Sequence, residues 1–128
     1  MIVDSSAVLA IFFAEPDAPE MVARLMAPGP KRISAVNWLE CAIKLDNAVA
    51  GASIELDAFL EDAGVEVAPA TASQARAERL AHRRFGKGRH PAGLNLGDCF
   101  AYALARELGE PLLAKGEDFP ATDLPLVR

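Results

Sequence analysis

The feature that most constrains the fold is the alternation of short apolar runs with longer segments of helical periodicity. Strand-like runs occupy residues 1–3, 31–34, 65–68 and 111–114. Between them, apolar residues recur at helical spacing. Successive strands separated by helices pair in parallel, because each helix carries the chain back across the sheet. We therefore expect an α/β fold, with a short and mostly parallel sheet flanked by helices.

Capping residues and helix-breaking residues mark the ends of the expected helices. Ser5 or Ser6 is a suitable first cap, Thr71 opens a polar helix, and Asn95 is a suitable cap for the last helix, which Gly109 ends. The predicted helices cover about residues 5–15, 18–26, 35–49, 53–62, 71–84 and 95–108. Residues 86–93 are rich in glycine and contain a proline, which favours an exposed loop.

The bulk composition describes an ordinary folded chain. At 128 residues, 52% of them hydrophobic, the sequence predicts a single domain over residues 1–128. It shows no secretory leader and no apolar stretch near the roughly 20 residues that a membrane span needs. Cys41 and Cys99 lack metal-binding spacing, so we expect two small buried helix residues in a reduced, cytoplasmic protein.

The net charge of −5 argues against nucleic acid as a partner, but the charge is unevenly distributed. Basic residues cluster in one stretch: Arg76, Arg79, Arg83, Arg84, Lys87 and Arg89. This basic flank has two readings, a solvated helix face with its following loop, or a surface that contacts phosphates. For the second reading we select Arg83, Arg84, Lys87 and Arg89.

Acidic residues stand where apolar segments end or begin. Asp4 follows the first strand, Glu40 borders the apolar face formed by Val36, Leu39 and Ile43, and Asp98 lies in the first turn of its helix. Asp118 follows the last strand, with Asp123 close behind. Each acid also has a structural reading, since Asp4 suits a helix cap and Asp98 suits the helix dipole.

Together these acids predict one metal site. Functional groups of an open parallel sheet collect at the carboxyl ends of its strands. Two carboxylates 4 Å apart repel by about 4 kcal/mol at an effective dielectric near 20, so a shared site needs a cation. Oxygen ligands suit Mg²⁺ or Mn²⁺, and such sites hydrolyse phosphodiesters without a serine or cysteine nucleophile.

Four segments resemble PIN-domain ribonucleases, and most closely the VapC-type toxins. They are residues 2–7 (IVDSSA), 33–40 (ISAVNWLE), 94–103 (LNLGDCFAYA) and 112–119 (LLAKGEDF). The resemblance implies a three-layer α/β/α fold, Mg²⁺ or Mn²⁺, RNA cleavage with tRNA or rRNA as candidate substrates, homodimers, and neutralisation by a cognate VapB-type antitoxin. It assigns catalysis and metal binding to Asp4, Glu40, Asp98 and Asp118, with Ser6 and Asn95 in support.

The chain departs from the family pattern at the fourth acid. Many relatives carry an aspartate directly after the last strand, where this sequence has Gly116. Asp118 is our first choice for the missing ligand, while Glu117 and Asp123 stay open. Two other functions remain as alternatives: a PIN fold that binds RNA or a partner without cutting, and a phospho-receiver domain. The receiver needs an aspartate after the third strand, where the sequence reads Ala68-Pro69.

Overall fold

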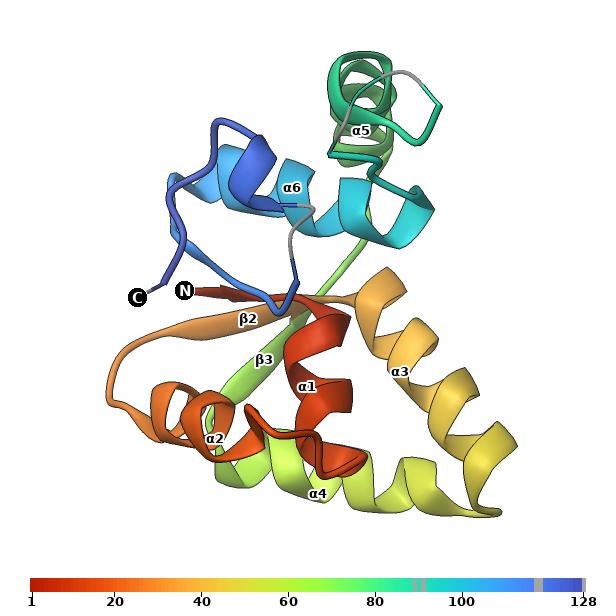
Figure 1. Cartoon of the computed structure of the whole chain (residues 1–128), viewed down its shortest axis with the longest axis vertical. Helices are drawn as coiled ribbons and strands as arrows, with labels where there is room; N and C mark the ends of the chain where they lie inside the picture. The colour runs from red at the N-terminus through yellow and green to blue at the C-terminus, as the bar shows by residue number, and fades with distance from the viewer. Residues whose placement is uncertain (89, 91, 117–118, 128) are drawn as a thin grey trace.

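The computed structural model describes residues 1–88, 90, 92–116 and 119–127, and within them the strands form one parallel sheet (Figure 1). The strands are β1 (Ile2–Val3), β2 (Lys31–Ser34), β3 (Val65–Ala68) and β4 (Leu112–Leu113), in the spatial order β3-β2-β1-β4. Ile2 of β1 lies opposite Arg32 in β2 and Leu112 in β4. All pairings are parallel, which confirms the predicted sheet.

Both faces of β1 and β4 are covered, and these two strands are wholly apolar, whereas β2 and β3 also carry polar residues. Side chains alternate between the faces along a strand. Val3 and Leu113 pack in one core with residues from the helices α1 to α4, while Ile2 and Leu112 pack in a second core with residues from α5 and α6. Figure 1 shows α5 and α6 on one side of the sheet and the first helices on the other. The predicted three-layer α/β/α architecture is confirmed.

The helices lie close to the predicted ranges: α1 (Ser5–Phe12), α2 (Ala18–Met26), α3 (Ala35–Ala48), α4 (Ala52–Asp62), α5 (Ala72–Phe85), α6 (Leu96–Leu108) and a short 3-10 helix η1 (Phe119–Ala121). Thr71 and Gln74 form a capping box at α5, and Asn95 caps α6. Asp4, and neither Ser5 nor Ser6, is the cap of α1. Gly109 closes α6 with φ of 63°, a left-handed conformation that favours glycine.

The predicted apolar face of α3 is wrong. Leu39 and Ile43 are each 51% exposed, whereas Asn37, Cys41 and Leu45 form the buried face. Helix α3 packs against α1, α4 and α6, and this places Asn37 and Cys41 against their neighbours. Glu40, next to Cys41 in sequence, still borders the buried face. The expected burial of both cysteines is confirmed.

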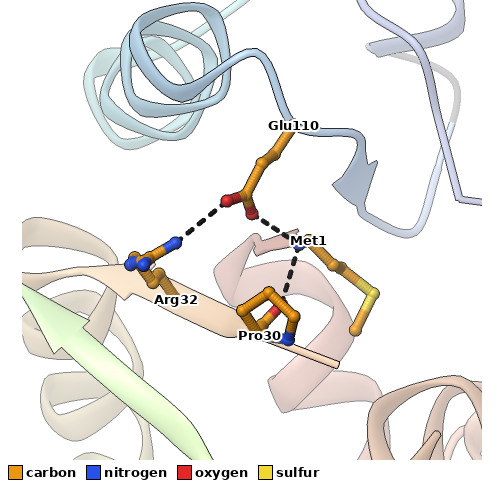
Figure 2. A network of polar contacts seen from close by, with 4 residues as sticks. All are labelled: Met1, Pro30, Arg32 and Glu110. Carbon is orange, nitrogen blue, oxygen red and sulfur yellow. Dashed lines mark hydrogen bonds and ion pairs between the residues drawn. The ribbon is translucent and has the colours of Figure 1, made fainter. Parts of the chain in front are cut away.

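The amino ends of the strands are held together by one carboxylate (Figure 2). The Met1 ammonium donates to the Pro30 carbonyl at 2.9 Å and to Glu110 at 2.5 Å, and Arg32 donates to the other oxygen of Glu110 at 2.9 Å. Glu110 therefore joins the starts of β1 and β2 to the segment that leads into β4. Of the described helices, none combines the length and apolar composition needed to cross a membrane.

Candidate active site

The first acid of the site is fixed at the carboxyl end of the central strand β1. Asp4 is 1% exposed, its amide donates to the Leu113 carbonyl at 2.9 Å, and its side chain accepts from the Ser6 amide at 2.9 Å. The Ser6 hydroxyl in turn accepts from the Lys115 amide, also at 2.9 Å. Ser6 thus ties the end of β1 to the residues that follow β4.

Glu40 approaches the same region from α3. Its carboxylate accepts a hydrogen bond from the Ser5 hydroxyl, the residue next to Asp4. A Cβ placed at Gly97 would lie 2.9 and 3.0 Å from the two oxygens of this carboxylate. Only a glycine therefore lets the start of α6 rest against Glu40 as it does here. Ser5 and Gly97 therefore hold the Glu40 carboxylate in place near Asp4.

Asn37 was not among the predicted site residues, yet it locks α3 to α6. It is fully buried, and its side-chain amide donates to the Gly97 carbonyl at 3.0 Å. This bond sets the position of α6 directly before Asp98. Sequence spacing carries no signal for Asn37, because its partner at Gly97 lies 60 residues away.

Asp98 forms a capping box with Asn95. The Asn95 side chain accepts from the Asp98 amide at 2.9 Å, and the Asp98 carboxylate accepts from the Asn95 amide at 3.1 Å. This arrangement confirms Asn95 as the cap of α6 and the structural reading of Asp98 as a first-turn residue. The side chain of Asp98 is only partly buried, so the cap does not seal it from solvent.

The carboxylates of buried Asp4 and partly buried Glu40 repel each other. Burial raises the pKa of Asp4, its hydrogen bonds with Ser6 oppose that shift, and the charge of Glu40 adds to it. Burial, together with the charges of Asp4 and Glu40, raises the pKa of the Cys41 thiol to about 12. Among the described residues, Oδ1 of Asp4 is buried without a hydrogen-bond partner. A cation at this oxygen would satisfy it and offset the repulsion.

The described residues supply part of the predicted ligand set. Among residues 1–88, 90, 92–116 and 119–127, no three acidic, histidine or cysteine side chains form a ready metal-binding group. Asp118 and Glu117 lie outside the described residues. Mg²⁺ keeps several waters and commonly binds through one or two carboxylates, so Asp4 and Glu40 fit such an ion without a complete protein cage.

Asp123 lies in a different environment. It accepts a hydrogen bond from the Tyr102 hydroxyl at 2.7 Å and lies 3.6 Å from both Arg84 and Arg106. These partners lower the pKa of Asp123, led by the Tyr102 hydrogen bond. The geometry gives no support to Asp123 as a metal ligand, and we do not carry it into the proposed site.

The predicted RNA-contacting residues divide between two faces of α5. Arg83 is exposed beside α6. Arg84 lies over the Phe85 ring, 4.8 Å from its centre, and close to Asp123. Lys87 is exposed beyond the helix, and Arg89 lies outside the described residues. Arg84 thus contacts Phe85 and Asp123 while its side chain stays 59% exposed, whereas Arg83 forms no ion pair with any described residue.

Comparison with known proteins places this geometry in a family. Residues 1–124 match the model of the PIN domain. Ribonuclease VapC of Mycolicibacterium smegmatis is 48% identical over 129 residues, covering 99% of both chains. Ribonuclease VapC30 of Mycobacterium tuberculosis is 44% identical over 128 residues, covering 99% of this chain and 98% of that protein.

Solved structures agree on the fold. The crystal structure of Mycobacterium tuberculosis VapC20, a Sarcin-Ricin loop cleaving toxin, superposes with a TM-score of 0.81 at 20% identity, covering 99% of this chain and 98% of that one. A toxin-antitoxin complex from Klebsiella pneumoniae gives a TM-score of 0.70 at 15% identity, covering 95% and 92%. The phospho-receiver alternative is thereby excluded. The chain belongs to the PIN-domain family, and within it to the VapC ribonucleases, the toxins of toxin-antitoxin systems.

Proposed function

We propose that residues 1–128 act as a single-domain, Mg²⁺- or Mn²⁺-dependent endoribonuclease that works in the cytoplasm. The observation that supports a metal ion is the buried, unpartnered Oδ1 of Asp4, beside the carboxylate of Glu40. Membership of a ribonuclease family supports the reaction. The carboxyl edge of the sheet is also where a fold of this kind places its functional groups.

Asp4 and Asp98 are the proposed direct ligands, with Glu40 and Asp118 completing the site. A divalent ion held by these residues would supply the Lewis acidity that activates water and the positive charge that offsets the scissile phosphate. The residues around it orient the ligands: Ser6 fixes Asp4, Ser5 and Gly97 fix Glu40, and the Asn95 cap fixes Asp98. The carboxylates of Asp4, Glu40 and Asp98 each accept a hydrogen bond from within the chain, and none of these donors depends on the ion.

The partners we propose are a cognate VapB-type antitoxin, RNA, and a second copy of the chain. One of the solved relatives is a toxin-antitoxin complex, which supports the antitoxin. For the homodimer, an apolar groove beside Glu40 offers a surface. It is lined by Val36, Leu39 and Ile43 of α3 and by Leu96 of α6, and Leu96 is 70% exposed. Exposed apolar area of this kind favours association.

The decisive experiment is cleavage of structured cellular RNAs by the purified chain, freed of antitoxin, with Mg²⁺ or Mn²⁺ and with EDTA. Asp98→Asn is the matched variant, because asparagine keeps an oxygen for the cap and removes the charge. We expect metal-dependent cutting that this variant abolishes while its thermal melt stays close to wild type. A folded Asp98→Asn protein with full activity would refute the assignment. A folded wild-type chain that binds metal but cuts none of these RNAs would favour the non-catalytic PIN alternative.

RNA contact by the basic flank needs its own test, because its two arginines differ. Arg83→Glu should weaken RNA binding and flatten the salt dependence, since a phosphate contact releases counterions. Arg84→Glu should mainly lower stability through its contacts with Asp123 and Phe85. If wild type and Arg83→Glu bound RNA equally well and with equal salt dependence, this face would be a solvated surface that does not contact phosphates.

A further inference from the structure

A second hollow lies between α5 and α6, beside the groove that contains Glu40. It has a volume of about 590 Å³. Its lining residues are Ala75, Glu78, Arg79, His82 and Arg83 from α5, and Leu96 and Phe100 from α6. We call it the α5–α6 groove. Leu96 also lines the groove that contains Glu40, so the two hollows meet at the start of α6. Figure 1 shows α5 lying across that end of α6.

Glu78 is the unusual member of the α5–α6 groove. It is only 6% exposed, and among the described residues its carboxyl group has no hydrogen-bond or ion-pair partner. Burial raises the pKa of Glu78 to about 7. Its neighbour across the helix interface, Cys99, has a pKa raised to about 12 by burial and by the charge of Glu78. Because Glu78 lines an open hollow and has no donor among the described residues, a ligand in the α5–α6 groove can supply the donors that its carboxyl group lacks.

The rest of the α5–α6 groove suits a nucleotide. Arg79 and Arg83 are exposed at its rim, and no described residue forms an ion pair with either of them. They are available for phosphates. Phe100 and Leu96 offer apolar surface, and base stacking on an aromatic ring contributes about 1–3 kcal/mol per base. The positive charge of the two arginines at the rim, the apolar wall and the carboxylate acceptor of Glu78 together fit the phosphate, the ring and the polar edge of an unpaired nucleotide.

We propose that the α5–α6 groove binds one unpaired guanine of the RNA substrate, next to the bond that is cut. The inference rests on the proposed ribonuclease function. Glu78 accepts from the N1–H and the N2 amino group of guanine, which is the base whose edge presents two adjacent donors. Uracil presents one such donor, and the amino groups of adenine and cytosine stand beside an acceptor that repels a carboxylate. Phe100 stacks on the base, and Arg79 contacts a flanking phosphate.

The test is binding of fluorescent pentamers, UUGUU, UUAUU and UU-inosine-UU, to the full chain carrying Asp4→Asn, which prevents cleavage. Inosine keeps N1–H and lacks the N2 amino group. We expect guanine to bind about tenfold more tightly than adenine, with inosine between them, as a bidentate pair predicts. Glu78→Gln should remove most of this preference. The matched control is Glu61→Gln, an exposed acid on α4, which should leave it unchanged.

A second pair of variants tests the phosphate contact. Arg79→Ala should weaken all three pentamers several-fold, whereas Arg76→Ala, on the same helix but outside the groove lining, should not. Glutamine at position 78 is neutral and similar in shape, so its thermal melt should match or exceed that of the parent chain. A guanine preference that persists in folded Glu78→Gln, or that is missing in the parent, overturns the inference.

The same variants separate this inference from the ribonuclease proposal. In an otherwise wild-type chain, Glu78→Gln should keep metal-dependent cleavage but lose its bias for sites beside guanine. Cleavage without any such bias in the wild type would refute the groove and leave the ribonuclease standing. Guanine binding that depends on Glu78, in a wild-type chain that cuts no RNA, would support the groove and refute the ribonuclease.

Discussion

Replacing Gly97 by alanine should damage the site through a single side chain. The added Cβ would lie 2.9, 3.0 and 3.2 Å from the two oxygens and the carbon of the Glu40 carboxylate. Ordinary contact begins near 3.4 Å, so the carboxylate must move by about half an ångström. Because Glu40 ends in a flexible chain it can move, and we expect this shift to turn its carboxylate away from the Ser5 hydroxyl.

The magnitude follows from two opposing contributions. A hydrogen bond to a carboxylate contributes about 1.5–3 kcal/mol, and glycine to alanine inside a helix gains about 0.5–1 kcal/mol. We therefore expect Gly97→Ala to lower the free energy of unfolding by about 1–2 kcal/mol, or roughly 4 °C per kcal/mol in Tm. Cleavage should fall by about 10–100-fold, since residues that orient metal ligands have effects of that size.

A double-mutant cycle isolates the cause. In a Glu40→Ala background the three atoms nearest to the new methyl group are gone, so Gly97→Ala should stabilise the protein by about 0.5–1 kcal/mol. The measurement is the free energy of unfolding in urea for the wild type, the two single variants and the double variant. If Gly97→Ala changed stability equally in both backgrounds, the close approach of Gly97 to Glu40 would not be the reason for glycine at this position.

Three further outcomes follow from the other acids. Asp4→Asn should abolish cleavage yet leave the melting temperature equal or higher, because asparagine still caps α1 and the repulsion with Glu40 is gone. Asp123→Asn should keep full metal-dependent cleavage and lower stability by under about 1 kcal/mol, as its arginine partners are exposed; lost cleavage would return it to the site. Glu110→Gln should lower stability by about 1 kcal/mol at pH 7. The hydrogen bond from the Met1 ammonium leads in lowering the pKa of Glu110 below its ordinary 4.5, so that stability is present above pH 4.5 and is lost as the pH falls further; a difference between variant and wild type that persisted in acid would contradict this account.

The fold was predictable because its determinants are local. Apolar runs covered on both faces predicted parallel strands, and the caps at Thr71 and Asn95 lie where the sequence placed them. The face of α3 was not predictable from periodicity. Leu39 and Ile43 have the right spacing for a core, yet the fold buries Asn37 beside them because its amide binds the Gly97 carbonyl. That partner is 60 residues away, and no local pattern indicates it.

The same difference between local and distant contacts explains the site. Asp4 and Asp98 were recognisable because their caps involve neighbours in sequence, Ser6 and Asn95. Glu40 was recognisable only as an acid at the border of a helix face, and its actual supports, Ser5 and Gly97, come from two other elements. Side chains that act as supports carry no charge pattern of their own, so spacing alone could not identify them.

These supports imply that the acidic site is assembled before an ion binds. Asp4, Glu40 and Asp98 each accept a hydrogen bond from within the chain, and none of these donors needs a cation to be in place. Among the described acids of the site, Asp4 keeps one buried oxygen without a hydrogen-bond partner, Oδ1, at the point where the charges of Asp4 and Glu40 add. A bound cation would therefore move the ligands little, and its main effect would be to neutralise their negative charge. Removing the cation should increase the repulsion between the carboxylates of Asp4 and Glu40 at the end of β1. The helices that carry the ligands should keep their positions.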